Sequence, residues 1–571
     1  MKHTLRPVTS LNGLWEFAFL GDIDPETFSP SGWHPSQQIL VPSAFDALPE
    51  WAGRRGAAAY RTRCVVPAGR PARLAFGAVS LWTRVFVDGE LRREHACGYA
   101  PIEVDLPAAS HTSRDVVVLV DNRFDFERVP MHEEYFDFYQ YGGILRDVFL
   151  HILPAGGPSI RHVQVAPTAD YRAGKVSVVI EVDGAGDRTL RLHAAFDGAE
   201  PEVHDVRAGA DGCVRLNLTV PAPRIWFPDA PELHSLRAVI VSAPAGVPID
   251  DAEVRFGLRS IEARDGRLWL NGEPLHLRGY NRHEWHPNFG PCTPSLLMLA
   301  DLQLLRQLGC NFVRGSHYPQ DQRFLDLCDE LGFLVWEENL GWGQREKTFA
   351  SAKFRHDHAE ALRAMVRASC NHPSVIIWGF LNEAGTDCDY VRPIFEETVS
   401  LLRSLDSTRL ISYASMFALT DRHFDLVDIV SVNLYPGWYG CEGEAAPLEL
   451  IAPHLRDCFA QIDQGPGAGK PILVSEIGAE ALYGWREPHH DFFSEEYQAE
   501  YLRRACREAE DNPRCSGIAL WHFSDVRTYG RGLSLKRPRT FNNKGTLDEY
   551  RRPKLAFAAV RSVFRGEAPA K

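Results

Sequence analysis

Eight short apolar runs alternate with amphipathic stretches between about residue 257 and the C-terminus, and this alternation most constrains the fold. The runs read LHLRGY, NFVRGS, FLVWEE, VIIWGFLNE, RLISYAS, DIVSVN, PILVSE and GIALWH. Between the first two, Thr293 is the expected N-cap of a helix, Pro294 its first residue and Gly309 its C-terminal stop. Eight strand and helix units predict a (β/α)8 barrel over residues 257–571.

The preceding residues, 1–154 and 155–256, show strand texture without helical periodicity. In the first segment LAFGAV, TRVFVDGE and DVVVLVDN are separated by turn residues, which indicates a β jelly-roll sandwich. In the second, KVSVVIEVDG and VRLNLTV repeat that texture over a length typical of an immunoglobulin-like β-sandwich. The chain is therefore predicted to be multidomain.

Charge and cysteine usage exclude several classes of function. A net charge of −13 without a basic run argues against nucleic-acid binding. The N-terminus has no apolar signal core, and no stretch approaches the roughly 20 apolar residues of a membrane span, so we expect a cytoplasmic protein without membrane contact. The 12 cysteines include no CxxC pair and predict free thiols. HEWH at His283 lacks the HExxH spacing, so no metal or cofactor is predicted.

Polar residues follow several of the apolar runs, at the rim where barrel enzymes carry their chemistry. They are Arg314 and His317 after the second run, Asn382 and Glu383 after the fourth, Asn433 and Tyr435 after the sixth, Glu476 after the seventh and Trp521 after the eighth. Glu383 and Glu476 would face each other, and glycoside hydrolysis requires such a pair of carboxyl groups. For either glutamate alone, a structural ion pair is the competing interpretation.

At these residues the chain resembles glycoside hydrolase family 2, which includes β-galactosidases and β-glucuronidases. The resemblance rests on LNGLWEF, DFYQYGGILR, WFPDAPELHSL, NRHEWHP, VRGSHYP, NHPSVIIWGFLNE and VSEIG, which begin at residues 11, 137, 226, 281, 313, 371 and 474. It implies a retaining exo-β-glycosidase whose jelly roll, residues 1–154, binds sugar. Many members are dimers or tetramers, so a homo-oligomer is one expectation.

The resemblance also implies roles for individual residues. Glu383 corresponds to the acid/base and Glu476 to the nucleophile, with their carboxyl groups expected roughly 5–5.5 Å apart as in retaining enzymes. The other positions carried over as substrate-binding or supporting residues are Asp137, His283, Arg314, His317, Asn382, Asn433, Tyr435, Tyr439 and Trp521.

The identity of the sugar depends on FNNKG near the C-terminus. In family glucuronidases, residues corresponding to Asn542 and Lys544 bind the uronic acid carboxylate, which an ammonium and an amide suit. The sequence therefore favours a β-glucuronidase acting on β-D-glucuronides. NRHEWHP is closer to the β-galactosidase form, so a β-galactoside or β-galactofuranoside stays an alternative, as does a role for Lys544 in anchoring its loop. A non-catalytic carbohydrate-binding protein is the alternative of another class.

Overall fold

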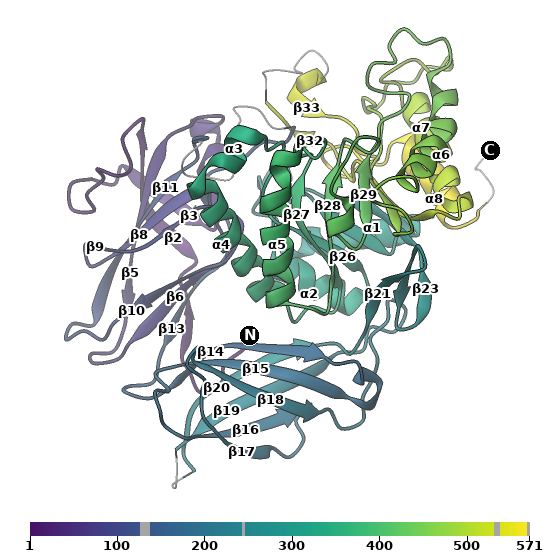
Figure 1. Cartoon of the computed structure of the whole chain (residues 1–571). Coiled ribbons are helices and arrows are strands. Elements are labelled where there is room, and N and C mark those ends of the chain that lie inside the picture. The colour runs from purple at the N-terminus through teal and green to yellow at the C-terminus, as the bar shows by residue number, and fades with distance from the viewer. Residues whose placement is uncertain (126–136, 243–245, 530–536, 568–571) are drawn as a thin grey trace.

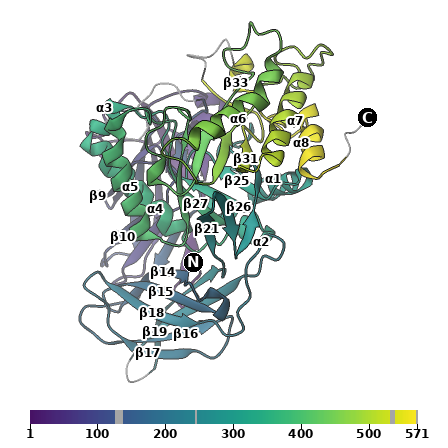
Figure 2. The same ribbon diagram turned by 45° about the vertical axis from the view of Figure 1, so that its right-hand side comes forward.

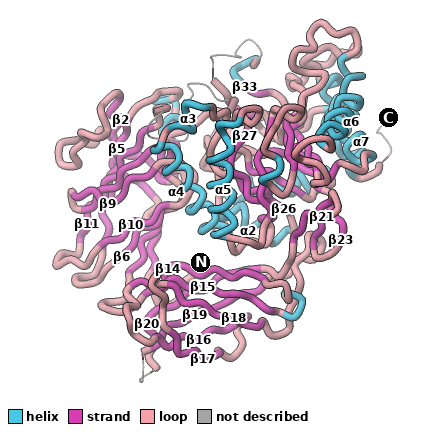
Figure 3. Tube along the Cα trace, in the orientation of Figure 1, coloured by secondary structure: helices cyan, strands magenta, loops and turns pink. Residues whose placement is uncertain are grey.

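The computed structural model describes residues 1–125, 137–242, 246–529 and 537–567. Two all-strand bodies and one barrel surrounded by helices make up the molecule, as Figure 3 shows. In Figure 1 the first body, purple, lies beside the barrel, and the second, blue, lies beneath both. The expected jelly roll, immunoglobulin-like sandwich and barrel are confirmed. The exact boundaries at residues 154 and 256 stay predictions.

The first body is a jelly-roll sandwich with strand orders β1-β13-β6-β10 and β3-β2-β5-β11-β8-β9, plus a small sheet β4-β12-β7. Its strands alternate buried and exposed residues, and Trp15, Tyr60 and Leu74 lie in the core between the sheets. The strands are β1 Val8–Ser10, β2 Gly13–Gly21, β3 Gln37–Val41, β4 Ser43–Ala44, β5 Ala57–Val65, β6 Ala72–Phe76, β7 Val79–Ser80, β8 Trp82–Val87, β9 Glu90–His95, β10 Ile102–Leu106, β11 Ser113–Asp121, β12 Gly143–Ile144 and β13 Val148–Ile152.

The second body packs the sheet β14-β15-β18 on the sheet β17-β16-β19-β20. Its buried residues follow the two-residue period of half-buried strands, with Val176, Val178 and Ile180 pointing inward from β15. The strands are β14 Ser159–Pro167, β15 Lys175–Asp183, β16 Leu190–Phe196, β17 Glu202–Val206, β18 Cys213–Thr219, β19 His234–Val241 and β20 Pro248–Phe256. A three-stranded sheet then leads to the barrel, formed by β21 Ile261–Arg264, β22 Arg267–Leu270 and β23 Glu273–Leu275.

The barrel closes in the order β24 to β31, with all neighbours parallel. Each of the eight predicted runs overlaps one of its strands, which are almost entirely buried, as parallel strands covered on both faces are. The strands are β24 Leu277–Asn281, β25 Phe312–Gly315, β26 Leu334–Glu338, β27 Val375–Asn382, β28 Leu410–Ser415, β29 Val430–Asn433, β30 Ile472–Glu476 and β31 Cys515–Leu520.

Helices cover the outside of the barrel, and α6, α7 and α8 lie on the side away from the first sandwich in both Figure 1 and Figure 2. The side facing that sandwich shares an apolar cluster with it, which includes Phe138, Tyr318 and Leu340. The helices are α1 Ser295–Leu308, α2 Gln322–Leu331, α3 Glu346–Ala350, α4 Ala352–Ser369, α5 Arg392–Leu405, α6 Ile451–Ile462, α7 Glu495–Asp511 and α8 Leu555–Phe564.

Two details of the predicted barrel are wrong. The N-cap of α1 is Pro294 rather than Thr293, because Pro294 is extended and its carbonyl accepts the first helical hydrogen bonds from Leu297 and Met298. Gly309 ends the helix as expected, in the left-handed region with φ of +90°. The fifth unit has no α-helix, since the short link from β28 to β29 forms only the 3-10 turn Phe424–Leu426, consistent with its lack of helical periodicity.

The twelve cysteines, from Cys64 to Cys515, are all free, which confirms that prediction. Within the described ranges, no helix is long and apolar enough to cross a membrane.

Candidate active site

The two predicted carboxylates lie on the same rim of the barrel, at the ends of β27 and β30. Glu476 is the last residue of β30, and Glu383 follows directly after β27. The Glu383 backbone adopts φ of +54°, a conformation that costs of order 1–3 kcal/mol in a residue with a side chain and that clusters at active sites. Its N–H donates to the carbonyl of Ala414 at 2.8 Å, which holds it against the end of β28.

Glu476 is 3% exposed and accepts a hydrogen bond on each carboxylate oxygen. Arg314 Nη1 donates to Oε1 at 2.8 Å, and the Tyr435 hydroxyl donates to Oε2 at 2.7 Å. Because a guanidinium can only donate, this arrangement favours the ionised carboxylate.

A network of amide side chains contacts Glu383. Asn433 Nδ2 donates to Glu383 Oε1 at 2.9 Å and to Asn382 Oδ1 at 3.1 Å, while Asn433 Oδ1 accepts from Ser475 at 2.7 Å. Asn382 Oδ1 also accepts from Arg314 at 2.8 Å. Asn382 Nδ2 is buried and has no hydrogen-bond partner among the described residues, so it is available as a donor to a substrate hydroxyl.

Burial raises the pKa of both carboxyl groups. The pKa of Glu383 lies above its ordinary range, an effect that the Asn433 amide and Arg314 oppose. Burial raises the pKa of Glu476 as well, and the nearby Glu383 adds to the rise, while Arg314 and the Tyr435 hydroxyl oppose it. Two such neighbours titrate as a pair, and the Arg314 cation beside Glu476 favours the proton on Glu383 and the charge on Glu476.

Aromatic rings and imidazoles form one wall of the site. Trp521, directly after β31, stacks on His317 with ring centroids 5.1 Å apart, and His283 approaches the same tryptophan edge-on at 5.5 Å. Burial lowers the pKa of His283 and His317 well below the usual value, so both are neutral near pH 7. Within the described structure, His283 Nε2 is buried without a hydrogen-bond partner and is open to a sugar hydroxyl.

Five polar side chains from three separate segments form a cluster that we call the selecting end. Lys544 Nζ donates to the Tyr439 hydroxyl at 2.8 Å, and Asn542 Nδ2 donates to Asp137 at 2.7 Å. Arg537 donates to both oxygens of Asp137, at 2.8 and 2.7 Å, and to Tyr439 at 2.8 Å. Asp137 thus reaches the barrel from the first sandwich, and Arg537 holds its pKa below the usual value although burial alone would raise it.

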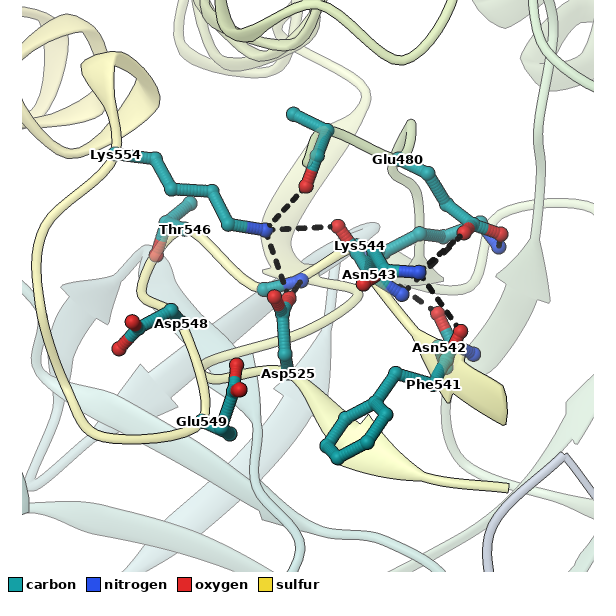
Figure 4. Close-up of polar contacts among 12 residues, drawn as sticks. Glu480, Asp525, Phe541, Asn542, Asn543, Lys544, Thr546, Asp548, Glu549 and Lys554 are labelled. Carbon is teal, nitrogen blue, oxygen red and sulfur yellow. Dashed lines mark hydrogen bonds and ion pairs between the residues drawn. The ribbon is translucent and has the colours of Figure 1, made fainter. Parts of the chain in front are cut away.

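A second lysine, Lys554, fixes the loop that carries Asn542 and Lys544, as Figure 4 shows. Lys554 Nζ is fully buried and donates to the carbonyls of Ala481 and Asn543, at 2.7 and 3.0 Å, and to Asp525 at 2.8 Å. All three ammonium donors are therefore used within the protein, which identifies Lys554 as a structural anchor and leaves Lys544 as the lysine at the site.

Two buried glutamates of the site were not predicted. Glu338 ends β26 and pairs with Arg314 through both oxygens, at 2.9 and 3.0 Å, and with His317 Nδ1 at 2.8 Å. Glu480 pairs with Lys544 at 3.4 Å and with Arg537. The sequence features that could have indicated them are the paired glutamates at the end of FLVWEE, for Glu338, and the acidic residue four places after Glu476, for Glu480. Arg537 pairs with both Asp137 of the selecting end and Glu480.

Possible metal ligands lie elsewhere. Among the described residues, two groups bring three such side chains together: His3 with Asp250 and Asp251, and Asp326 with Asp329 and His372. In the second group Asp329 and His372 already bond each other at 2.5 Å. Neither group borders the two rim carboxylates, so neither takes part in the chemistry of Glu383 and Glu476.

A barrel rim with paired carboxyl groups, one of them bonded to an arginine, is the arrangement of a glycosidase. Residues 261–566 match the model of the glycosyl hydrolases family 2 TIM barrel domain, and residues 159–259 match a second family 2 model. The chain therefore belongs to glycoside hydrolase family 2, and it is a β-glycoside hydrolase with the retaining mechanism general to that family.

Its relatives include several uronidases. The chain is 27% identical to a β-glucuronidase of Sus scrofa, over 97% of this chain and 90% of that protein. The structure of a β-galacturonidase from Eisenbergiella tayi bound to galacturonate superposes with a TM-score of 0.89 at 33% identity, covering 100% of this chain and 99% of that one. A β-glucuronidase from Bifidobacterium dentium complexed with coumarin-3-O-glucuronide gives 0.88 at 25%, covering 99% and 98%.

Proposed function

We propose that this enzyme is a β-glucuronidase that removes terminal β-D-glucuronic acid from its glycosides. The observation that carries the proposal is the position of Lys544, a fully buried ammonium that lies 5.6 Å from the ring of Tyr435, whose hydroxyl bonds Glu476. Within the described structure Lys544 bonds Tyr439 and Glu480, which leaves one of its three N–H donors for a ligand. A uronic acid carboxylate accepts that donor in a charged hydrogen bond stronger than one to a neutral hydroxymethyl group. Asn542 beside Lys544 offers an amide to the same carboxylate.

In this proposal Glu476 attacks the anomeric carbon while Glu383 protonates the departing oxygen. The bond from carbon to the aglycone oxygen breaks as the bond to Glu476 forms, which gives a covalent glycosyl-enzyme. Arg314 and Tyr435 hold Glu476 ionised before attack. Once Glu476 is esterified its charge is gone, so the pKa of Glu383 falls and Glu383 can take a proton from the incoming water. Retention of the anomeric configuration follows.

The remaining predicted residues would bind the sugar. Asn382 is assigned to the 2-hydroxyl through its unpaired Nδ2, and His283 to another hydroxyl through its unpaired Nε2. Trp521 and His317 line the wall beside the ring, and Asp137 accepts from a hydroxyl near Lys544. Asn433 holds Glu383 in place.

A β-D-galacturonide is the second candidate, favoured by the 33% identity to the Eisenbergiella tayi β-galacturonidase. The two sugars share the C5 carboxylate and differ only in the orientation of the 4-hydroxyl. A panel of aryl β-glycosides tests both: glucuronide, galacturonide, glucoside, galactoside and galactofuranoside. Greatest kcat/KM on the glucuronide supports the proposal, greatest on the galacturonide supports the second candidate, and greatest on a neutral sugar contradicts both.

A further inference from the structure

Lys544 is not alone in its buried position, because a glutamate that the proposed mechanism does not use lies against it. Both Lys544 and Glu480 have fully buried side chains, and Lys544 Nζ lies 3.4 Å from Glu480 Oε1. Figure 4 shows Glu480 and Lys544 lying side by side above Asn542. Glu480 reaches this place from the segment after β30, four residues beyond Glu476, so it connects the barrel rim to the selecting end.

We propose that Glu480 is a positioning residue for substrate specificity, which keeps the Lys544 side chain charged and aimed at the carboxylate of the uronic acid. This proposal rests on the proposed function. Without an anion at this place, an isolated buried ammonium loses its proton rather than remain charged. A neutral amine cannot form an ion pair with a carboxylate.

The hydrogen bonds around Lys544 fit this role. Among the described residues its three N–H donors have two acceptors, the Tyr439 hydroxyl and Glu480, so one donor is available to a ligand. Glu480 itself is fixed by Asn543 Nδ2 at 3.2 Å and by Arg537. Because Glu480 is held from two sides, the geometry of the ammonium is set before the sugar arrives.

Charged and titratable groups from several segments face the Lys544 ammonium and influence its pKa. Burial and the Arg537 cation lower the pKa of Lys544 to about 8, while Glu480 and Asp137 raise it. Removing the Glu480 charge therefore lowers the pKa of Lys544 further. The groups concerned are Glu480 after β30, Arg537 before β33 Phe541–Asn542, Asp137 from the first sandwich, Tyr435 and Tyr439 after β29, and His522 after β31.

The test measures competitive inhibition by D-glucuronate against pH, with D-glucose as the neutral probe, in the parent enzyme and in Glu480→Gln. In the variant we expect glucuronate to bind about tenfold more weakly at pH 7, and its binding to fall off with rising pH at a lower pH than in the parent. D-Glucose inhibition should stay within about twofold. Glu495→Gln is the matched control, since Glu495 is equally buried but bonds Gly484 and Leu555 instead.

Glu480→Asp keeps the charge and shortens its reach. In Glu480→Asp the pH at which glucuronate binding falls should stay at the parent value, while KM for the aryl glucuronide should rise. An unchanged KM in this variant overturns the positioning role, and this test holds even if Glu480→Gln fails to fold. Equal glucuronate binding by parent and Glu480→Gln at every pH overturns the inference and leaves the proposed function intact. A parent enzyme that prefers neutral glycosides overturns both.

Discussion

The candidate site has two halves that are assembled by different means. The catalytic half consists of the strand ends that carry Glu383 and Glu476, and the selecting end consists of the segments that carry Asp137, Tyr439 and Lys544. At the catalytic half, consecutive parallel strands bring their last residues to a common rim, so the fold itself brings the side chains together. At the selecting end the residues come from the first sandwich, from the loop after β29 and from the segment that contains and flanks β33. Among the described residues, side-chain hydrogen bonds and ion pairs join these segments. In the proposed function, reaction chemistry therefore depends on the barrel, and sugar choice depends on these three segments.

The largest effect should come from the catalytic half. Glu476→Gln removes the nucleophile, and we expect kcat to fall by at least about a thousandfold on every substrate, charged or neutral. Glu337→Gln is the control, because Glu337 is equally buried but bonds Gln320 and Ser369 instead. Steady-state kinetics on the aryl glycoside panel measures this loss. Retained turnover in Glu476→Gln would place the nucleophile elsewhere.

The selecting end should respond to substitution in a substrate-dependent way. Lys544→Ala removes the ammonium, and we expect kcat/KM on the aryl glucuronide to fall by about 100-fold, corresponding to about 2–3 kcal/mol for a charged hydrogen bond. Activity on the aryl galactoside should change little. Comparison of the two kcat/KM ratios separates loss of specificity from loss of folding. An equal decrease on both sugars would assign Lys544 to loop anchoring, the competing interpretation of its motif.

These two halves also differ in how far the sequence predicts them. The eight barrel strands and the carboxylates after β27 and β30 follow from apolar runs that end in polar residues, a pattern with a physical cause. Asn542 and Lys544 were placed only through a family motif. Glu480 and Arg537 carry no periodic signal, because their contacts join positions far apart in the chain, such as Asp137 and Arg537. Glu338 was not predicted, because the pair of glutamates that ends β26 does not show which of the two bonds Arg314.

A smaller effect should follow removal of one hydrogen bond at the catalytic half. Tyr435→Phe removes the hydroxyl that donates to Glu476 at 2.7 Å, and we expect kcat to fall by about 10- to 100-fold, since hydrogen bonds to charged groups contribute about 1.5–3 kcal/mol. The loss should be equal for glucuronide and galactoside. A loss confined to the glucuronide would show that Tyr435 acts on Lys544, whose ammonium lies 5.6 Å from its ring, rather than on the nucleophile.

The smallest expected change is a shift in pH dependence. Glu383 raises the pKa of Glu476, so Glu383→Gln should lower that pKa and move the acidic limb of kcat/KM to lower pH. The alkaline limb due to Glu383 should disappear. The profile is best measured with an aryl glycoside whose leaving group needs no protonation. An acidic limb that stays in place would mean that the two carboxyl groups do not interact.

The central claim, that Glu476 attacks a glucuronic acid held by Lys544, can be tested in one trapping measurement. 2-Deoxy-2-fluoro-β-D-glucuronyl fluoride should form a stable covalent adduct. The 2-fluorine slows both formation and hydrolysis of the glycosyl-enzyme, and the good fluoride leaving group speeds only its formation, so the adduct accumulates. Intact mass followed by peptide mapping should show one fluoroglucuronyl group, attached to Glu476. An adduct on another residue would contradict the assignment of the nucleophile. Reaction only with the corresponding fluorogalactosyl fluoride would contradict the assignment of the sugar.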